Sequence, residues 1–85
     1  METLEQQFNK AVEDVQSGAA TIKPTNANKL ALYALFKQVE QGDVIGEKPG
    51  MTDFVARAKY SAWEKLKGVG REDAMKRYIE KSRES

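Results

Sequence analysis

The chain has 85 residues, of which 40% are hydrophobic and 32% charged, and its net charge is +1. A chain this short builds one hydrophobic core, so we expect a single domain over residues 1–85. It contains neither cysteine nor histidine, which excludes disulfides and cysteine–zinc sites and removes the commonest general base. We therefore expect no catalytic residues and no metal site.

The apolar segments are too short for a membrane protein. The longest apolar run covers residues 30–36, far below the roughly 20 residues that cross a bilayer. The first residues have neither the basic start nor the apolar stretch of a signal peptide. We expect a cytoplasmic protein without stable membrane insertion.

The first predicted helix covers residues 3–16. Its apolar residues fall on one stripe at spacings of three and four: Leu4, Phe8, Ala11, Val12 and Val15. Gly18 ends this helix, and a loop to Pro24 follows because a residue before proline avoids helical angles.

The second predicted helix begins at Thr25 or Asn26, since either side chain can cap a first turn, and it ends at Gly42. Apolar side chains cover more than one of its faces. A small protein cannot bury a helix on all sides. We therefore expect part of this surface to form a groove for a ligand or partner.

The chain continues with a long connection, residues 43–50, which is too long for a tight antiparallel turn. A third helix is predicted from Thr52 or Asp53 to Gly68. A fourth has a weak start signal between Gly70 and Asp73. Its predicted inner face consists of Ala74, Met75, Tyr78 and Ile79.

Tyr33, Phe36 and Lys37 stand at i, i+3 and i+4 of the second helix, so they share one face. They are either core aromatics beside a snorkelling lysine or a site for a purine ring and a phosphate. Spacing alone favours the interpretation as core aromatics beside a snorkelling lysine. Tyr78 has a similar ordinary interpretation as a half-buried core residue with a solvated hydroxyl.

Three sequence blocks, in order from Phe8 to Ile79, resemble the acyl-CoA-binding protein family. The first is the helix over residues 24–39 with Gly42-Asp43, which carries Leu30-Ala31-Leu32-Tyr33-Ala34-Leu35-Phe36-Lys37-Gln38-Val39. The second block is Lys48-Pro49-Gly50-Met51, Asp53-Phe54, Ala58-Lys59-Tyr60-Ser61-Ala62-Trp63 and Leu66-Lys67-Gly68. The third is Glu72-Asp73-Ala74-Met75-Lys76 with Tyr78-Ile79.

The resemblance implies an all-α, antiparallel four-helix bundle of up-down-down-up topology. It also implies a non-enzymatic monomer that needs no cofactor and reversibly binds medium- and long-chain acyl-CoA in a surface groove. By position, Tyr33 and Lys37 match residues that meet the CoA head group, and Lys37 and Lys59 match those facing its 3′-phosphate. Tyr78 matches an aromatic beside the adenine, and Leu30 lies where the family lines the acyl channel.

Three positions depart from the family pattern. Phe36 stands where many members have tyrosine, so a hydroxyl near the head group is missing and the ring remains. Lys29 replaces a commonly apolar residue near the channel lip, which bears on chain-length preference. Tyr60 stands where tryptophan is frequent.

Two other functions compete with acyl-CoA binding. An exposed apolar strip could take a partner helix, as in a helical protein-interaction module. The basic, aromatic third helix could bind nucleic acid, but acidic residues dilute it and the whole chain is near neutral, which argues against nucleic acid as a partner.

Overall fold

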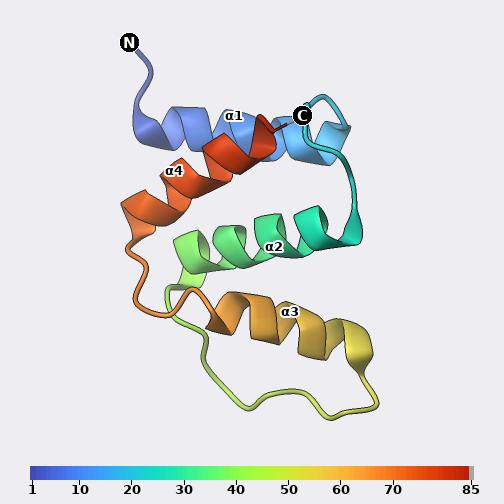
Figure 1. Ribbon diagram of the computed structural model, residues 1–85. Coiled ribbons are helices and arrows are strands. Elements are labelled where there is room, and N and C mark those ends of the chain that lie inside the picture. Colours follow the sequence, from blue (N-terminus) through green and yellow to red (C-terminus); the bar gives the residue numbers. More distant parts are fainter. Residues whose placement is uncertain (85) are drawn as a thin grey trace.

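The computed structural model describes residues 1–84, and within them the chain forms four α-helices and no strand. The helices are α1 (Leu4–Ser17), α2 (Asn26–Gln41), α3 (Phe54–Glu64) and α4 (Arg71–Ser82). In Figure 1, α1 and α4 run in one direction while α2 and α3 run in the other. The predicted all-α fold and its up-down-down-up order are confirmed.

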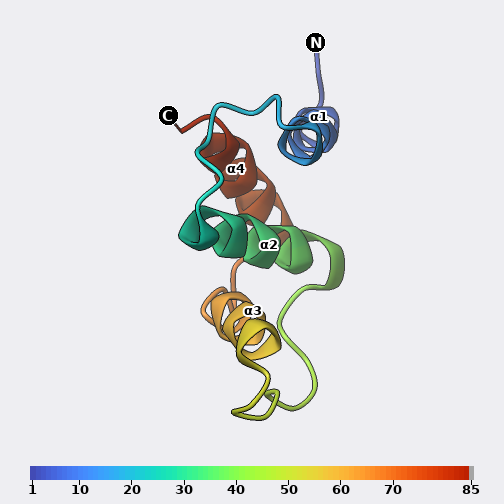
Figure 2. The ribbon, with the colours of Figure 1, turned by 90° about the vertical axis from the view of Figure 1, so that its right-hand side faces the viewer.

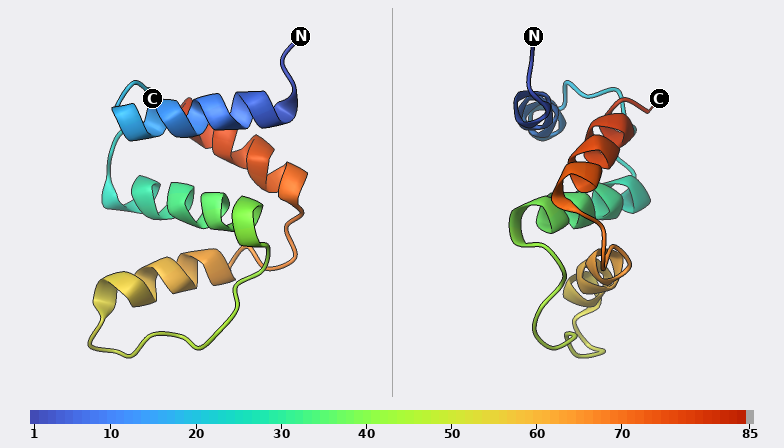
Figure 3. Two further views of the ribbon diagram at one scale, coloured as in Figure 1. Left: turned by 180° about the vertical axis from the view of Figure 1, so that it is seen from behind. Right: turned by 90° about the vertical axis from the view of Figure 1, so that its left-hand side faces the viewer.

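The helices form a flat row rather than a bundle around one axis. α2 packs against both α4 and α3, whereas α1 packs against α4, and Figure 2 shows this order of α1, α4, α2 and α3. The backbone measures 44 × 25 × 16 Å along its principal axes, and Figure 3 shows the thin dimension from the side. Within the described residues, α1 packs only against α4 and α3 only against α2, so each of these two helices keeps an uncovered face.

The main core lies between α1, α2 and α4. Ten buried side chains form it: Phe8, Ala11, Ile22, Leu32, Leu35, Val39, Ala74, Met75, Tyr78 and Ile79. The stripes predicted for the first and fourth helices therefore do face the core. α3 adds the buried Trp63, and the turn after it adds the partly buried Leu66. α3 is therefore attached mainly through one side of α2.

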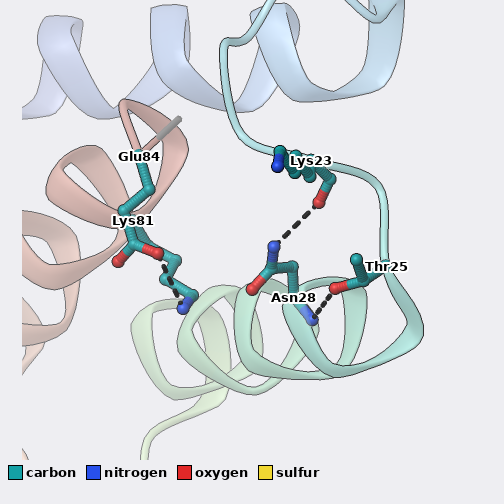
Figure 4. Close-up of polar contacts among 5 residues, drawn as sticks. All are labelled: Lys23, Thr25, Asn28, Lys81 and Glu84. Atoms are coloured by element: carbon teal, nitrogen blue, oxygen red, sulfur yellow. Dashed lines mark hydrogen bonds and ion pairs between the residues drawn. The ribbon is translucent and has the colours of Figure 1, made fainter.

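Side-chain caps set where three helices begin. Thr3 forms a capping box with Gln6 at the start of α1, and the carboxylate of Asp53 accepts the N–H of Ala56 at 3.2 Å in α3. At α2 the cap is Thr25 rather than Asn26, since its hydroxyl accepts the N–H of Asn28 at 3.1 Å (Figure 4).

Figure 4 also shows a hydrogen bond in the loop that enters α2 and an ion pair at the end of α4. The amide nitrogen of Asn28 donates to the carbonyl of Lys23 at 2.8 Å, which fixes the loop entering α2. Lys81 pairs with Glu84 at 3.0 Å beyond the last turn of α4. The start of α2 is thus well defined, and this end of the helix carries part of the site described below.

α3 ends at Glu64, four residues before the predicted end at Gly68. Its last residues tighten into i→i−3 turns, because the N–H of Leu66 donates to Trp63 and that of Lys67 donates to Glu64. Gly68 itself has φ +89°, a left-handed conformation that glycine tolerates. The glycine therefore ends the turn that follows the helix.

The connection over residues 42–53 lies alongside α3, as Figure 1 shows, and brings α3 back parallel to α2. Polar contacts bind it to that helix. The hydroxyl of Tyr60 donates to the carbonyl of Gly46 at 2.9 Å, and the guanidinium of Arg57 donates to Pro49 at 3.0 Å. The long connection is thus anchored at intermediate points.

Candidate functional site

Two ammonium groups from different helices converge on one ring. Nζ of Lys37, on α2, lies 5.9 Å from the ring centroid of Tyr33, and Nζ of Lys59, on α3, lies 5.1 Å from it. Both distances fit cation–π contacts. The structure therefore brings Tyr33, Lys37 and Lys59 together at the α2–α3 seam, although 22 residues separate the two lysines in the chain.

The charge of this cluster is not neutralised from within the fold. Among residues 1–84, neither Lys37 nor Lys59 forms an ion pair with a carboxylate. Lys37 also lies 5.8 Å from the ring centroid of Trp63. Two cations beside aromatic rings make a concentrated positive surface that suits an anion such as a phosphate.

An aromatic pocket of about 210 Å³ adjoins the cluster. Tyr33, Phe36 and Tyr78 line it together with residues of α1 and Lys29. Phe8 supports the rings from beneath, since its centroid lies 6.3 Å from that of Phe36 in a stacked arrangement and 5.1 Å from that of Tyr78, edge to face. The pocket can hold a flat ring beside the cations.

Tyr78 is more deeply placed than the half-buried position expected from the sequence. Only 3% of its surface is exposed, and burial raises the pKa of its phenol above the usual value. Tyr78 therefore reaches the base of the aromatic pocket with only one edge of its ring. The burial follows from its neighbours Ala74 and Met75, which bring that face of α4 into the core.

An apolar pocket of about 390 Å³ opens on the other side of Tyr33, at the amino-terminal ends of α2 and α3. We call it the acyl pocket, and its lining consists of Asn26, Lys29, Leu30, Phe54, Val55, Ala58 and Lys59. Phe54 and Val55 are 79% and 66% exposed. Such large exposed apolar side chains around a concave surface are typical of a binding site.

The two pockets and the cation cluster form one continuous strip. Lys29 lines both the aromatic pocket and the acyl pocket, and Lys59 belongs to both the acyl pocket and the cluster. All six residues selected from the sequence lie on this strip. An elongated ligand with a flat ring, an anionic group and an apolar chain would match the aromatic pocket, the cation cluster and the acyl pocket of this strip.

A buried polar network fixes α3 against α2 and so sets the distance between the lysines. Gln38 is 2% exposed. Its amide nitrogen donates to Asp43 at 2.8 Å and to the carbonyl of Val69 at 3.0 Å, and its oxygen accepts from Trp63 at 3.1 Å. The indole also donates to the carbonyl of Gly42 at 2.9 Å.

Asp43 closes this network. Its carboxylate accepts the backbone N–H of Gly68 at 2.8 Å, in the turn that follows α3. This hydrogen bond has the largest effect on the Asp43 carboxyl, and the bond from Gln38 has the next largest. Together they hold the pKa of that carboxyl below its usual value. The network joins the end of α2, the connection over residues 42–53 and the turn before α4.

Sequence spacing identified the face of Tyr33, Phe36 and Lys37, but it did not identify the structural supports. Apolar spacing places Phe8 only on the core stripe, and no local motif marks Gln38 as a positioning residue. A glutamine among the apolar residues of α2 was the available signal. The approach of Lys37 to Trp63 joins residues 26 positions apart and has no local signal.

Two negative findings concern residues 1–84. They contain no cluster of three or more acidic side chains arranged to hold a metal ion. No helix in this range combines the length and the apolar character that a membrane crossing requires.

Comparison with known proteins gives concordant matches. The family model described as "Acyl CoA binding protein" matches residues 5–82. The chain is 48% identical over 66 residues to acyl-CoA-binding protein homolog 1 of Caenorhabditis elegans, covering 72% of this chain and 77% of that protein. It is 45% identical over 76 residues to the acyl-CoA-binding protein homolog of Drosophila melanogaster, covering 89% and 86% respectively.

A solved structure shares the fold. The crystal structure of Oryza sativa acyl-CoA-binding protein 2 matches with a TM-score of 0.84 at 32% sequence identity, covering 94% of this chain and 87% of that chain. The family match extends over nearly the whole chain and includes all four helices apart from the first residue of α1. The chain therefore belongs to the acyl-CoA-binding protein family.

Proposed function

We propose that this chain reversibly binds medium- and long-chain fatty acyl-CoA esters and buffers and transports them in the cytoplasm without changing them chemically. The observation that carries the proposal is the convergence of Lys37 and Lys59 on Tyr33 beside the acyl pocket. One strip thereby offers separate surfaces for the nucleotide and for the hydrocarbon. Membership of the family supports the same ligand class.

Each part of the ligand has a matching surface. The 3′-phosphate of CoA would lie between Lys37 and Lys59, where two ammonium groups can donate charge-assisted hydrogen bonds. The adenine would enter the aromatic pocket formed by Tyr33, Phe36 and Tyr78. The acyl chain would begin its path in the acyl pocket past Leu30.

The hydrocarbon would dominate affinity and the lysines would select the ligand class. Burial of a chain stabilises a complex by about 0.8 kcal/mol per methylene, or about 12 kcal/mol for a palmitoyl chain before the costs of association. A charge-assisted bond to a phosphate adds about 1.5–3 kcal/mol. That contribution favours CoA esters over free fatty acids.

We further propose that the protein acts as a monomer on a small-molecule ligand and does not bind nucleic acid. A single chain supplies both lysines, the aromatic pocket and the acyl pocket, so the strip is complete without a second copy. The net charge of +1 is far from the basic balance of nucleic-acid modules. With no histidine or cysteine in the chain, binding is the activity that the site supports.

Calorimetric titration tests the proposal. Palmitoyl-CoA, free CoA and free palmitate are titrated separately into the purified protein at one salt concentration. We expect palmitoyl-CoA to bind at least a hundredfold more tightly than either fragment, because only the ester occupies both surfaces. Equal affinity for all three, or no saturable response to palmitoyl-CoA, would contradict the proposal.

A further inference from the structure

Lys29 occupies the junction of the strip. Among residues 1–84 it alone lines both the aromatic pocket and the acyl pocket. It follows the same stripe of α2 as Tyr33 and Lys37, at spacings of four and eight positions. The helical rise places it about 6 Å before Tyr33 along the axis, and Lys37 lies about 6 Å beyond that ring. The two lysines of α2 therefore flank Tyr33 on opposite sides.

The ammonium group of Lys29 is available to an external anion. Its side chain is exposed, and it forms no ion pair with a carboxylate in the described part of the chain. Lys37 and Lys59, by contrast, both lie over the ring of Tyr33. A lysine in a pocket wall can also extend its apolar stem along the surface and leave its charge in water. The tests below separate these two roles.

The ligand has an anionic group that the cation cluster leaves without a partner. In CoA one ribose carries a 3′-phosphate and a 5′-diphosphate, and the diphosphate leads to the pantetheine and the acyl chain. The proposed placement assigns the 3′-phosphate to Lys37 and Lys59. With the adenine in the aromatic pocket and the acyl chain in the acyl pocket, the segment that links them passes the residue that both pockets share.

We propose that Lys29 binds the 5′-diphosphate of the acyl-CoA and forms a second anion site, separate from the pair formed by Lys37 and Lys59. The inference rests on the proposed function and adds a specificity-determining residue to it. An ammonium group at this junction can donate charge-assisted hydrogen bonds to the diphosphate oxygens. The chain therefore recognises acyl esters of 3′-dephospho-CoA, which lack the 3′-phosphate and keep the diphosphate, in preference to acyl esters of pantetheine.

The first test removes charges from the protein and phosphates from the ligand. Dissociation constants of decanoyl-CoA, decanoyl-3′-dephospho-CoA and S-decanoylpantetheine are measured by calorimetry for the wild type, Lys29→Met and Lys37→Ala. We expect Lys29→Met to weaken binding of the two phosphorylated esters by the same factor, about three- to tenfold, and to leave the pantetheine ester unchanged. Lys37→Ala should instead weaken decanoyl-CoA and leave the dephospho ester nearly unchanged.

Two further variants serve as controls for charge and position. Lys29→Arg keeps the positive charge and should bind decanoyl-CoA within about twofold of the wild type. Lys23 lines a hollow of about 220 Å³ together with Lys29 but belongs to neither pocket of the strip. Lys23→Met removes the same charge from a neighbouring position and should weaken binding by less than about twofold, because solvent and salt screen a charge that does not touch the ligand.

Several outcomes would overturn the inference. Unchanged affinity of Lys29→Met for both phosphorylated esters would leave the ammonium group in water. A loss confined to decanoyl-CoA would assign Lys29 to the 3′-phosphate, and an equal loss with the pantetheine ester would assign the effect to the stem. An equal loss in Lys23→Met would reduce the effect to the general field of the surface. Failure of the wild-type protein to bind decanoyl-CoA would instead contradict the proposed function itself.

A second test observes the phosphorus nuclei of the bound ligand. Phosphorus NMR separates the 3′-phosphate from the diphosphate, because a phosphate monoester and a diphosphate resonate at different chemical shifts. Spectra of decanoyl-CoA are recorded with saturating wild-type protein and with saturating Lys29→Met. We expect the diphosphate resonances to differ between the two complexes and the 3′-phosphate resonance to coincide. A difference confined to the 3′-phosphate, or identical spectra, would overturn the inference.

Discussion

Nζ of Lys59 lies 5.1 Å from the ring centroid of Tyr33, and this contact crosses from α3 to α2. The site is therefore formed by the docking of two helices that share few core residues. Trp63 is buried at this seam, while the main core lies on the far side of α2. Whatever shifts α3 changes the distance between the two cations.

The two lysines should contribute to ligand affinity in a coupled way. Lys37→Ala and Lys59→Ala should each weaken palmitoyl-CoA binding about tenfold or more, because each removes a charge-assisted bond. The double variant should weaken binding by less than the product of the single effects if both meet one phosphate. Calorimetry of the four proteins measures this coupling.

Lys76→Ala is the matched control, since Lys76 is exposed on α4 and lines none of the pockets described. It should leave the dissociation constant unchanged. Lys37→Ala should also lower the free energy of unfolding by about 1 kcal/mol through its lost cation–π contacts. An unchanged affinity in both Lys37→Ala and Lys59→Ala would remove the cluster from the binding site.

Phe36→Tyr should tighten acyl-CoA binding about two- to tenfold, because it adds one hydroxyl at the wall of the aromatic pocket. The ring already stacks on Phe8 at 6.3 Å, so the substitution should leave stability nearly unchanged. Titration with palmitoyl-CoA measures the change. Equal affinity of the two proteins would show that the hydroxyl meets no group of the ligand.

The helices were predictable from the sequence because their causes are local. Apolar spacing placed α1 and α4, and capping residues located helix starts to within a residue or two. The end of α3 lies at Glu64 and not at the predicted Gly68. The N–H of Gly68 donates to Asp43, 25 residues away in the chain, so the turn after the helix is held by a contact that no local pattern shows. Such a contact exists only after the helices have docked.

The site was predictable to a similar extent. Tyr33, Phe36 and Lys37 could be grouped from their spacing, whereas Lys59 was joined to them through family resemblance and not through any local pattern. The cavity of about 610 Å³ between α2 and α3, whose lining includes five alanines from these helices, could not be predicted, because alanines at a helix seam usually indicate close packing. Only the relative position of α2 and α3 leaves them around a hollow.

Gln38→Met should destabilise the fold and weaken binding together. The substitution keeps a similar volume but removes the bonds to Asp43, Val69 and Trp63. The carbonyl of Val69 loses this donor, whereas Trp63 still donates to Gly42 and Asp43 still accepts from Gly68. A buried group left without a partner costs about 1–3 kcal/mol, so we expect a loss of about 1–3 kcal/mol in denaturant unfolding. Palmitoyl-CoA affinity should fall although Gln38 lines neither pocket of the strip.

The control for this prediction is Gln41→Met, at an exposed position in the last turn of α2. It should change neither stability nor affinity beyond about 0.5 kcal/mol. If Gln38→Met lost stability but retained full affinity, the network would hold the fold without positioning the lysines.

Tyr78 should make the fold sensitive to alkaline pH. Burial raises the pKa of its phenol, so above about pH 10 the unfolded chain ionises this group before the folded chain does. The resulting stability is complete below that pH and is lost as the pH rises through the folded pKa. Tyr78→Phe keeps the ring, and the variant should lose less stability than the wild type between neutral and alkaline pH when both are unfolded in urea. An identical loss in both proteins would show that Tyr78 is not the source of the alkaline sensitivity.

Asp43 should make the fold sensitive to acid in the opposite sense. The N–H of Gly68 and the amide of Gln38 hold the pKa of its carboxyl below the usual value, so the folded chain retains the charged form at a pH where the unfolded chain takes up a proton. This contribution is complete above about pH 5 and is lost as the pH falls through the folded pKa. Asp43→Asn should lower stability at pH 7 and show a shallower decline below pH 5 than the wild type. Asp53→Asn, at the exposed cap of α3, is the matched control, because asparagine caps a helix about as well as aspartate and the substitution removes one carboxylate outside the network. Parallel declines in wild type and Asp43→Asn would show that the acid sensitivity arises from other carboxylates.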